Sequence, residues 1–184
     1  MKPNKHILWL TQSALFIALL ISWQFVSRNI PGTLATGTGV NFILVIAVML
    51  GVSQTPLRTG LTVAAVSPVM AFSLGVTPLP SFALVPFIAA GNIALVMLWS
   101  LIGRRQPRAL AGIIALGIAA GVKCGVLYLG VVRVAIPMLL DLPAPAVRNL
   151  SAAFGITQLF TALMGGALAF ATLPLLNRAT RVSS

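Results

Sequence analysis

Runs of apolar residues alternate with short polar connections along the whole chain. A helix that crosses a bilayer needs roughly 20 apolar residues, and fewer where other parts of the protein cover it. Prolines, glycines or basic residues in the connections end each run. The pattern therefore predicts six transmembrane helices, over 7–27, 39–53, 57–76, 80–103, 109–135 and 149–177.

The composition supports a membrane protein. Hydrophobic residues make up 59% of the 184 positions, only 7% are charged, and the mean hydropathy is +1.06. A soluble domain of this length would need a far more polar surface. We predict an all-α integral membrane bundle of six transmembrane helices, forming a single membrane domain over 1–184. The first run lacks a small-x-small cleavage pattern at its end, so we interpret it as a retained helix.

Basic residues in the connections predict the orientation of the bundle. With the N-terminus in the cytoplasm, eight fall on the cytoplasmic side: Lys2, Lys5, Arg58, Arg104, Arg105, Arg108, Arg178 and Arg181. Three fall on the outer side: Arg28, Arg133 and Arg148. This imbalance predicts that both termini are cytoplasmic. It also explains the net charge of +11 without a nucleic-acid partner, and the basic ends are expected to contact anionic lipid headgroups.

The residues needed for several kinds of chemistry are scarce. The chain has one histidine, one cysteine, no glutamate and one aspartate, Asp141. We therefore expect no enzyme activity, no metal site and no cofactor, because hydrolysis and metal binding need clusters of such groups. Ion-coupled transport usually needs intramembrane acids, and a nucleotide-binding GxxxxGK[ST] loop is missing too. Energy for uphill transport would have to come from a partner protein.

Small residues form two candidate packing faces. Ala14, Ala18 and Ser22 recur every four residues on the first helix, a spacing that lets another helix approach closely in lipid. Gly117, Gly121 and Gly125 repeat the pattern on the fifth helix. Ordinary packing inside the bundle is the alternative interpretation of both faces.

Polar side chains within the runs are candidate ligand contacts. Counting along the predicted helices places Asn92, Lys123 and Gln158 at about one depth, in the outer half of the membrane or near its midplane. The same count places the remaining candidates nearer the outer mouth: Asn41, Tyr128, Arg133 and Trp23. Interhelical hydrogen bonds, interface anchoring and snorkelling are the structural alternatives. We predict that Lys123 lies opposite the glycine face and points into a cavity, where water or an acceptor-rich substrate offsets its charge.

Several stretches together resemble a known family. They are the A-x-x-x-A pattern of Ala14 and Ala18, "GTGVN" at 37–41, "SPVMAFSLG" at 67–75 and "VPFIAAGN" at 85–92. With six helices and a length near 180, the chain resembles the substrate-binding S components of energy-coupling factor (ECF) vitamin transporters. The resemblance spans nearly the whole chain.

The resemblance implies a mechanism and partners. An S component binds a vitamin from outside, joins a membrane coupling subunit and two ATP-binding subunits, and topples to release its cargo inside. The small face of the first helix would dock on the coupling subunit. The implied location is the plasma membrane of a Gram-positive bacterium, as a multi-pass protein.

The cargo is less narrowly indicated. Few aromatic residues and no nearby carboxylate argue against flat or cationic vitamins, so an anionic or acceptor-rich cargo is expected. The chain looks most like the cobalamin-uptake S components of lactobacilli, and pantothenate is the alternative. A membrane scaffold without a ligand and an uncoupled pore are the rival functions.

Overall fold

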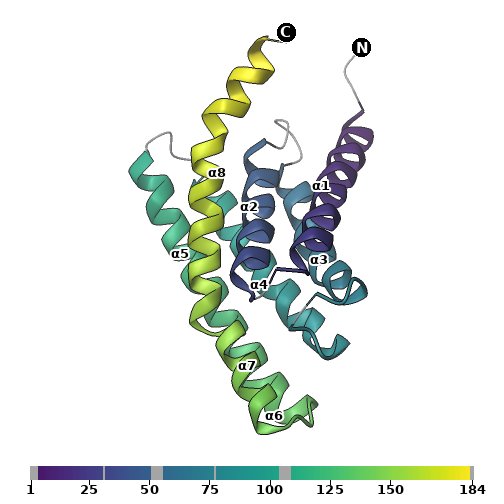
Figure 1. Ribbon diagram of the computed structural model, residues 1–184. Coiled ribbons are helices and arrows are strands. Elements are labelled where there is room, and N and C mark those ends of the chain that lie inside the picture. The colour runs from purple at the N-terminus through teal and green to yellow at the C-terminus, as the bar shows by residue number, and fades with distance from the viewer. Residues whose placement is uncertain (1–3, 31, 51–55, 77, 104–108, 183–184) are drawn as a thin grey trace.

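The computed structural model describes residues 4–30, 32–50, 56–76, 78–103 and 109–182. These residues form helices and connections, without a strand among them. The helices are α1 (Lys5–Ser27), α2 (Leu34–Leu50), α3 (Pro56–Ser73), η1 (Phe82–Leu84), α4 (Val85–Leu98), η2 (Trp99–Gly103), α5 (Ala109–Leu127), η3 (Tyr128–Ala135), α6 (Ile136–Leu139), α7 (Ala144–Phe154) and α8 (Ile156–Val182). Figure 1 shows them as one bundle, with both ends of the chain at the same end of it.

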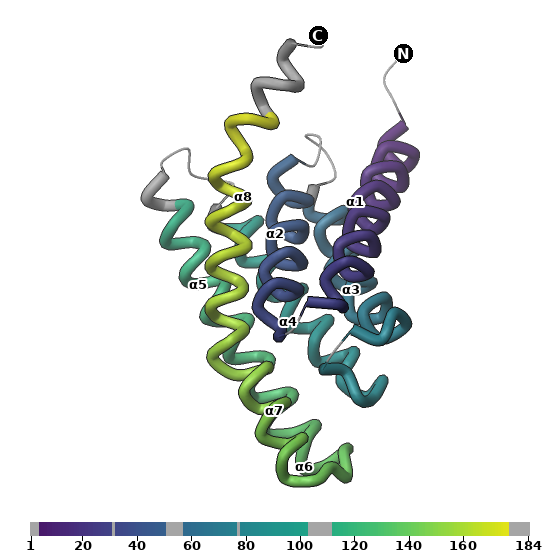
Figure 2. Tube along the Cα trace, viewed as in Figure 1, coloured from purple at the N-terminus to yellow at the C-terminus, as the bar shows by residue number. Residues whose placement is uncertain are grey.

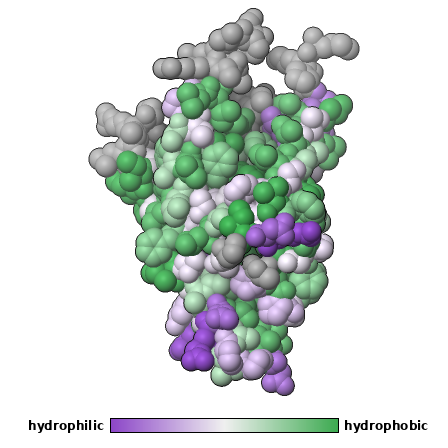
Figure 3. All heavy atoms as spheres, viewed as in Figure 1, coloured by the Kyte–Doolittle hydropathy of each residue, from purple (hydrophilic) through white to green (hydrophobic). Residues whose placement is uncertain are grey.

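Four helical segments in the described residues are long and apolar enough to cross a membrane. They are Lys5–Ser27, Phe82–Ile102, Gly112–Leu139 and Ala144–Leu176, and the shorter apolar helices are Leu34–Leu50 and Leu57–Ser73. Apolar side chains cover most of the face in Figure 3, and hydrophilic ones lie at the end formed by α6 and α7 and in a patch part-way up the right side. The protein is therefore an all-helical bundle compatible with a membrane.

Two of the differences between the expected helices and the structure bear on the site. α2 begins at Leu34 rather than at 39, because "LATGT" continues the helix instead of forming a loop. The expected end of this helix at 53 lies outside the described residues. The helix expected over 149–177 is two helices, because the backbone of Gly155 (φ −92°, ψ −129°) is not helical and separates α7 from α8.

α1 and α2 are buried to very different extents. The buried residues of α1 form a single stripe with spacings of three or four: Ser13, Phe16, Leu20, Gln24 and Ser27. This spacing is that of one helix face, so the opposite side of α1 is uncovered. α2 is buried at every position from Ile43 to Val48, because α1, α3, α4 and α8 pack around it. The tube in Figure 2 shows α8 running alongside α2.

Glycines allow α8 to lie close against α2. A Cβ at Gly165 would lie 2.5 Å from the Thr38 carbonyl oxygen and 2.7 Å from the Phe42 amide nitrogen. The face expected to pack closely on α5 does not do so: a Cβ at Gly117, Gly121 or Gly125 would meet nothing within 4 Å. Packing inside the bundle therefore does not account for the α5 glycines, and α8 carries the close approach instead.

Alanine substitution at these two glycine positions should have opposite effects. We expect Gly165→Ala to lower the free energy of unfolding by about 1–3 kcal/mol, because backbone atoms of α2 cannot move aside for the added methyl group. Gly121→Ala should leave it unchanged or raise it by up to ~1 kcal/mol, because alanine favours helix and the space is open. Denaturant titration in detergent measures both, and equal effects would contradict the α2–α8 contact.

Candidate ligand-binding site

The side chain of Lys123 lies inside the bundle, only 2% exposed. Its ammonium donates hydrogen bonds to Asn41 Oδ1 at 2.5 Å and to Asn92 Oδ1 at 2.7 Å. Both asparagines are also buried, so α2, α4 and α5 meet at this charge. A buried ammonium needs acceptors around it, and the amide oxygens supply them where no acid is available. The long side chain does not snorkel out of the bundle.

A second set of hydrogen bonds orients Asn41. Its Nδ2 donates to Thr161 Oγ1 on α8 at 3.2 Å, and Thr161 Oγ1 donates to the Gln158 carbonyl oxygen at 3.2 Å. With its nitrogen directed at α8, Asn41 must present its oxygen to Lys123. Asn41 was expected near the outer mouth. It reaches Lys123 because the early start of α2 places it seven residues, roughly 10 Å, into that helix.

A cavity of about 90 Å³ lies against these side chains. Its polar wall comes from six helices and includes Gln24, Asn41, Ser67, Asn92, Lys123 and Gln158. Its apolar wall includes Val40, Pro68, Ala71, Ile88 and Phe154. The mixture of a few polar groups among apolar walls is typical of small-molecule sites.

The cavity extends from Lys123 to the connections between helices. Thr33 belongs to the α1–α2 connection, and Val76, Pro78 and Leu79 belong to the connection that follows α3. The same Val76, Pro78 and Leu79 also line a separate cleft of about 330 Å³ against α7, whose wall includes Asn149 and Leu150. One connection thus forms the wall shared by an inner polar cavity and an outer cleft.

The structure brings together four of the seven predicted ligand residues. Lys123, Asn92, Gln158 and Asn41 line the cavity. Gln158 is half-buried, and its Nε2 donates to the Ala153 carbonyl oxygen at 3.0 Å across the break at Gly155.

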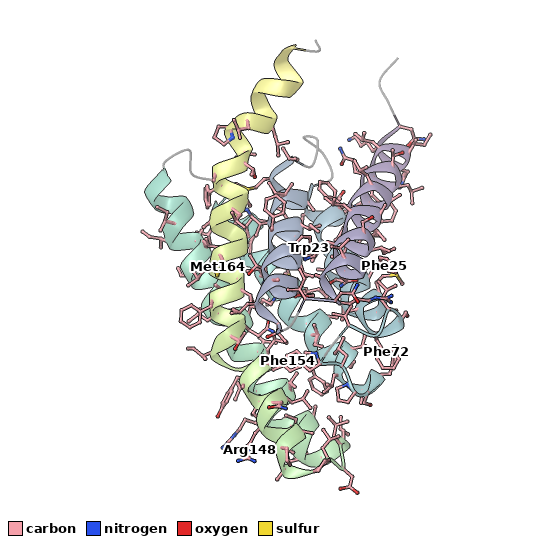
Figure 4. The ribbon with its side chains drawn as sticks, in the orientation of Figure 1. Trp23, Phe25, Phe72, Arg148, Phe154 and Met164 are labelled. Carbon is pink, nitrogen blue, oxygen red and sulfur yellow. The ribbon has the colours of Figure 1, made fainter. Side chains whose placement is uncertain are left out.

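The other three candidates lie elsewhere. Tyr128 and Arg133 are exposed on η3 and do not line the cavity. Trp23 lies between α1 and α2 (Figure 4) and donates from Nε1 to the Thr36 carbonyl oxygen at 3.3 Å. It lines an apolar groove of about 440 Å³ between α1, α2 and α8, to which Met164 also contributes.

Gln24 and Thr161 are site residues that the sequence analysis missed. Gln24 is 1% exposed and lines the cavity from α1. The available signal was its position two residues after Ser22, about 200° around the helix from the small face. Thr161 carried no such signal, because a threonine within an apolar helix often bonds only to its own backbone.

The three candidate docking residues are uncovered. Ala14, Ala18 and Ser22 are exposed along one side of α1. The Ser22 hydroxyl donates to the Ala18 carbonyl oxygen at 2.9 Å, so the helix itself satisfies it. These three residues form a strip of small side chains on the side of α1 that faces away from the bundle.

Known proteins offer no assignment for the site. No protein-family model, curated protein or solved structure matches the chain. Among the described residues, no three of the side chains that commonly bind metal ions lie close enough to share one. The site's geometry is therefore the basis for inferring its function.

The amide oxygens that accept hydrogen bonds from Lys123 should stabilise the fold mainly because this lysine is charged. We expect Asn92→Leu to lower the free energy of unfolding by about 1.5–3 kcal/mol, because it removes a hydrogen bond to a buried ammonium. The double variant Asn92→Leu/Lys123→Met should regain most of this loss, because it buries no charge. Thermal unfolding in detergent tests this, and a double variant less stable than Asn92→Leu would contradict the interpretation.

Proposed function

We propose that the chain is the substrate-binding S component of an ECF-type vitamin importer. The observation that carries the proposal is a buried Lys123, held by two amide oxygens, at the wall of a cavity that reaches the interhelical connections. A buried charge with no stabilising acid is expensive to keep and is usually functional in a membrane protein. An acceptor-bearing cargo would complete its coordination.

The uncovered side of α1 supports a partner in the membrane. Ala14, Ala18 and Ser22 form a strip with the four-residue spacing that allows close helix contact. In the proposed complex this strip contacts the membrane coupling subunit, which joins two ATP-binding subunits. Those subunits supply the energy, because the chain has no phosphate-binding loop of its own.

The proposal includes six crossings with both termini in the cytoplasm of a Gram-positive bacterium. It is supported by the position of the two chain ends at one end of the bundle in Figure 1. The α6–α7 end, opposite to them, would face outward, and the label of Arg148 marks it in Figure 4. Of the basic residues used to predict orientation, Lys2, Arg104, Arg105 and Arg108 lie outside the described residues.

The volume of the site favours a compact cargo. The inner cavity of about 90 Å³ is below the roughly 300–1,000 Å³ of typical ligand pockets, whereas the adjoining cleft of about 330 Å³ reaches that range. A small acid such as pantothenate would need only a shift of the shared wall at Val76, Pro78 and Leu79. A corrinoid such as cobalamin, which the family resemblance favours, would need a much wider opening of the connections.

Docking through α1 can be separated from ligand binding. We expect Ala14→Leu and Ala18→Leu each to abolish co-purification with the coupling subunit, because the larger side chains prevent close helix contact. Ala65→Leu, at an exposed alanine of α3, is the matched control and should assemble normally. Ligand binding by the isolated protein should survive in all three. Normal assembly of both α1 variants would reject the docking surface.

Lys123 should be required for ligand binding. A thermal-shift panel of pantothenate, biotin, folate, cobalamin and cobinamide is expected to yield one ligand, whose affinity Lys123→Met lowers by about 10–150-fold, as for a hydrogen bond to a charged group. Arg133→Met removes an exposed base outside the cavity and should bind normally. Unchanged affinity in Lys123→Met would remove Lys123 from the site. A panel without any ligand would instead favour a scaffold subunit.

A further inference from the structure

The polar atoms left unpaired around the cavity describe what its ligand must carry. An ammonium has three N–H donors, and the described residues accept two of those from Lys123, through Asn41 and Asn92. Asn92 uses its oxygen for Lys123, and its amide nitrogen has no partner in the described part of the chain. Lys123 and Asn92 thus leave donors available at the same wall of the cavity. Two neighbouring donors, one of them charged, match a carboxylate or a similar anion.

Gln24 contributes the opposite kind of group. Its Nε2 donates to the Ser67 carbonyl oxygen at 3.1 Å, and since a carbonyl can only accept, this bond sets the orientation of the amide. The Oε1 atom is consequently left as an acceptor, and it is buried without a hydrogen-bond partner among the described residues. Buried polar atoms are rarely left unpaired, so each instance needs an explanation. Here the side chain is 1% exposed and lines the cavity that Lys123 lines.

We propose that the ligand of this cavity is a small molecule with two features: an anionic group that binds Lys123 and Asn92, and an N–H or O–H donor that binds Gln24 Oε1. The inference rests on the proposed function and narrows its substrate class. Acids without a donor leave Gln24 unpaired, and neutral donors leave the ammonium without an anionic acceptor. Hydroxy acids and amido acids satisfy both groups at once.

Three probes separate the two features. Pantothenate carries a carboxylate together with hydroxyl and amide donors, pantothenol carries the donors without the carboxylate, and lipoate carries a carboxylate without a donor. Calorimetric titration of the purified protein should show pantothenate binding at least about tenfold more tightly than either of the others. Binding of pantothenol or lipoate as tightly as pantothenate would overturn the proposed class.

Two variants test whether the donor group of the ligand binds Gln24 Oε1. Gln24→Met should weaken pantothenate binding about tenfold and leave lipoate binding unchanged, since lipoate never used the Oε1 acceptor. Gln12→Met is the matched control, because Gln12 lies on the same helix, also has a buried unpaired Oε1, and does not line the cavity. It should bind both probes as the parent does. Equal weakening of both probes by Gln24→Met would show that Gln24 only ties α1 to α3, and would overturn its assignment.

The outcomes distinguish this inference from the function it rests on. Binding of cobalamin without pantothenate would leave an S component standing and overturn the compact acid. Failure of all three probes, and of cobalamin, biotin and folate, would reject both. The melting temperature of each unliganded variant shows whether folding, rather than ligand contact, accounts for a loss.

Discussion

The burial of one ammonium group among apolar helices is the constraint on which the centre of the molecule depends. Taking such a charge out of water costs several kcal/mol even after the protein relaxes, and the single acid of the chain, Asp141, lies outside the apolar helices. Two amide oxygens, from α2 and α4, provide the alternative. They must be oriented correctly, which is why Thr161 on α8 holds the nitrogen of Asn41. Four helices are thereby positioned around a single proton donor.

The sequence predicts the existence of the helices better than their ends. Polar and basic residues bound the apolar runs, so α1 and α5 begin within two residues of their predicted positions. The start of α2 could not be read, because "TGTG" has the composition of a loop and becomes helical only when packed between neighbours. The break at Gly155 could not be predicted either, since a glycine within an apolar run occurs both where a helix continues and where it ends.

Only part of the site could be predicted from the sequence, for a related reason. Depth counting brought Lys123, Asn92 and Gln158 together, because rise per residue is nearly constant in a helix. Counting residues does not determine how a helix is rotated about its axis. This rotation decides that Trp23 faces an apolar groove while Gln24, one residue later, faces the cavity. α1 consequently has two distinct sides. One carries the exposed small residues Ala14, Ala18 and Ser22, and the other carries Gln24, whose Oε1 is buried without a hydrogen-bond partner among the described residues.

The charge of Lys123 also has an electrical consequence. A unit charge that crosses the full membrane potential changes energy by roughly 2.3 kcal/mol per 100 mV. An empty bundle that reorients in the bilayer would carry the ammonium through part of this field, whereas a bundle holding a carboxylate beside Lys123 would carry no net charge there. Voltage would then bias the empty protein between its two orientations and leave the loaded protein almost indifferent. If Lys123 binds an anion in an importer, as proposed, its charge would make the return step, and not the delivery step, sensitive to the membrane potential.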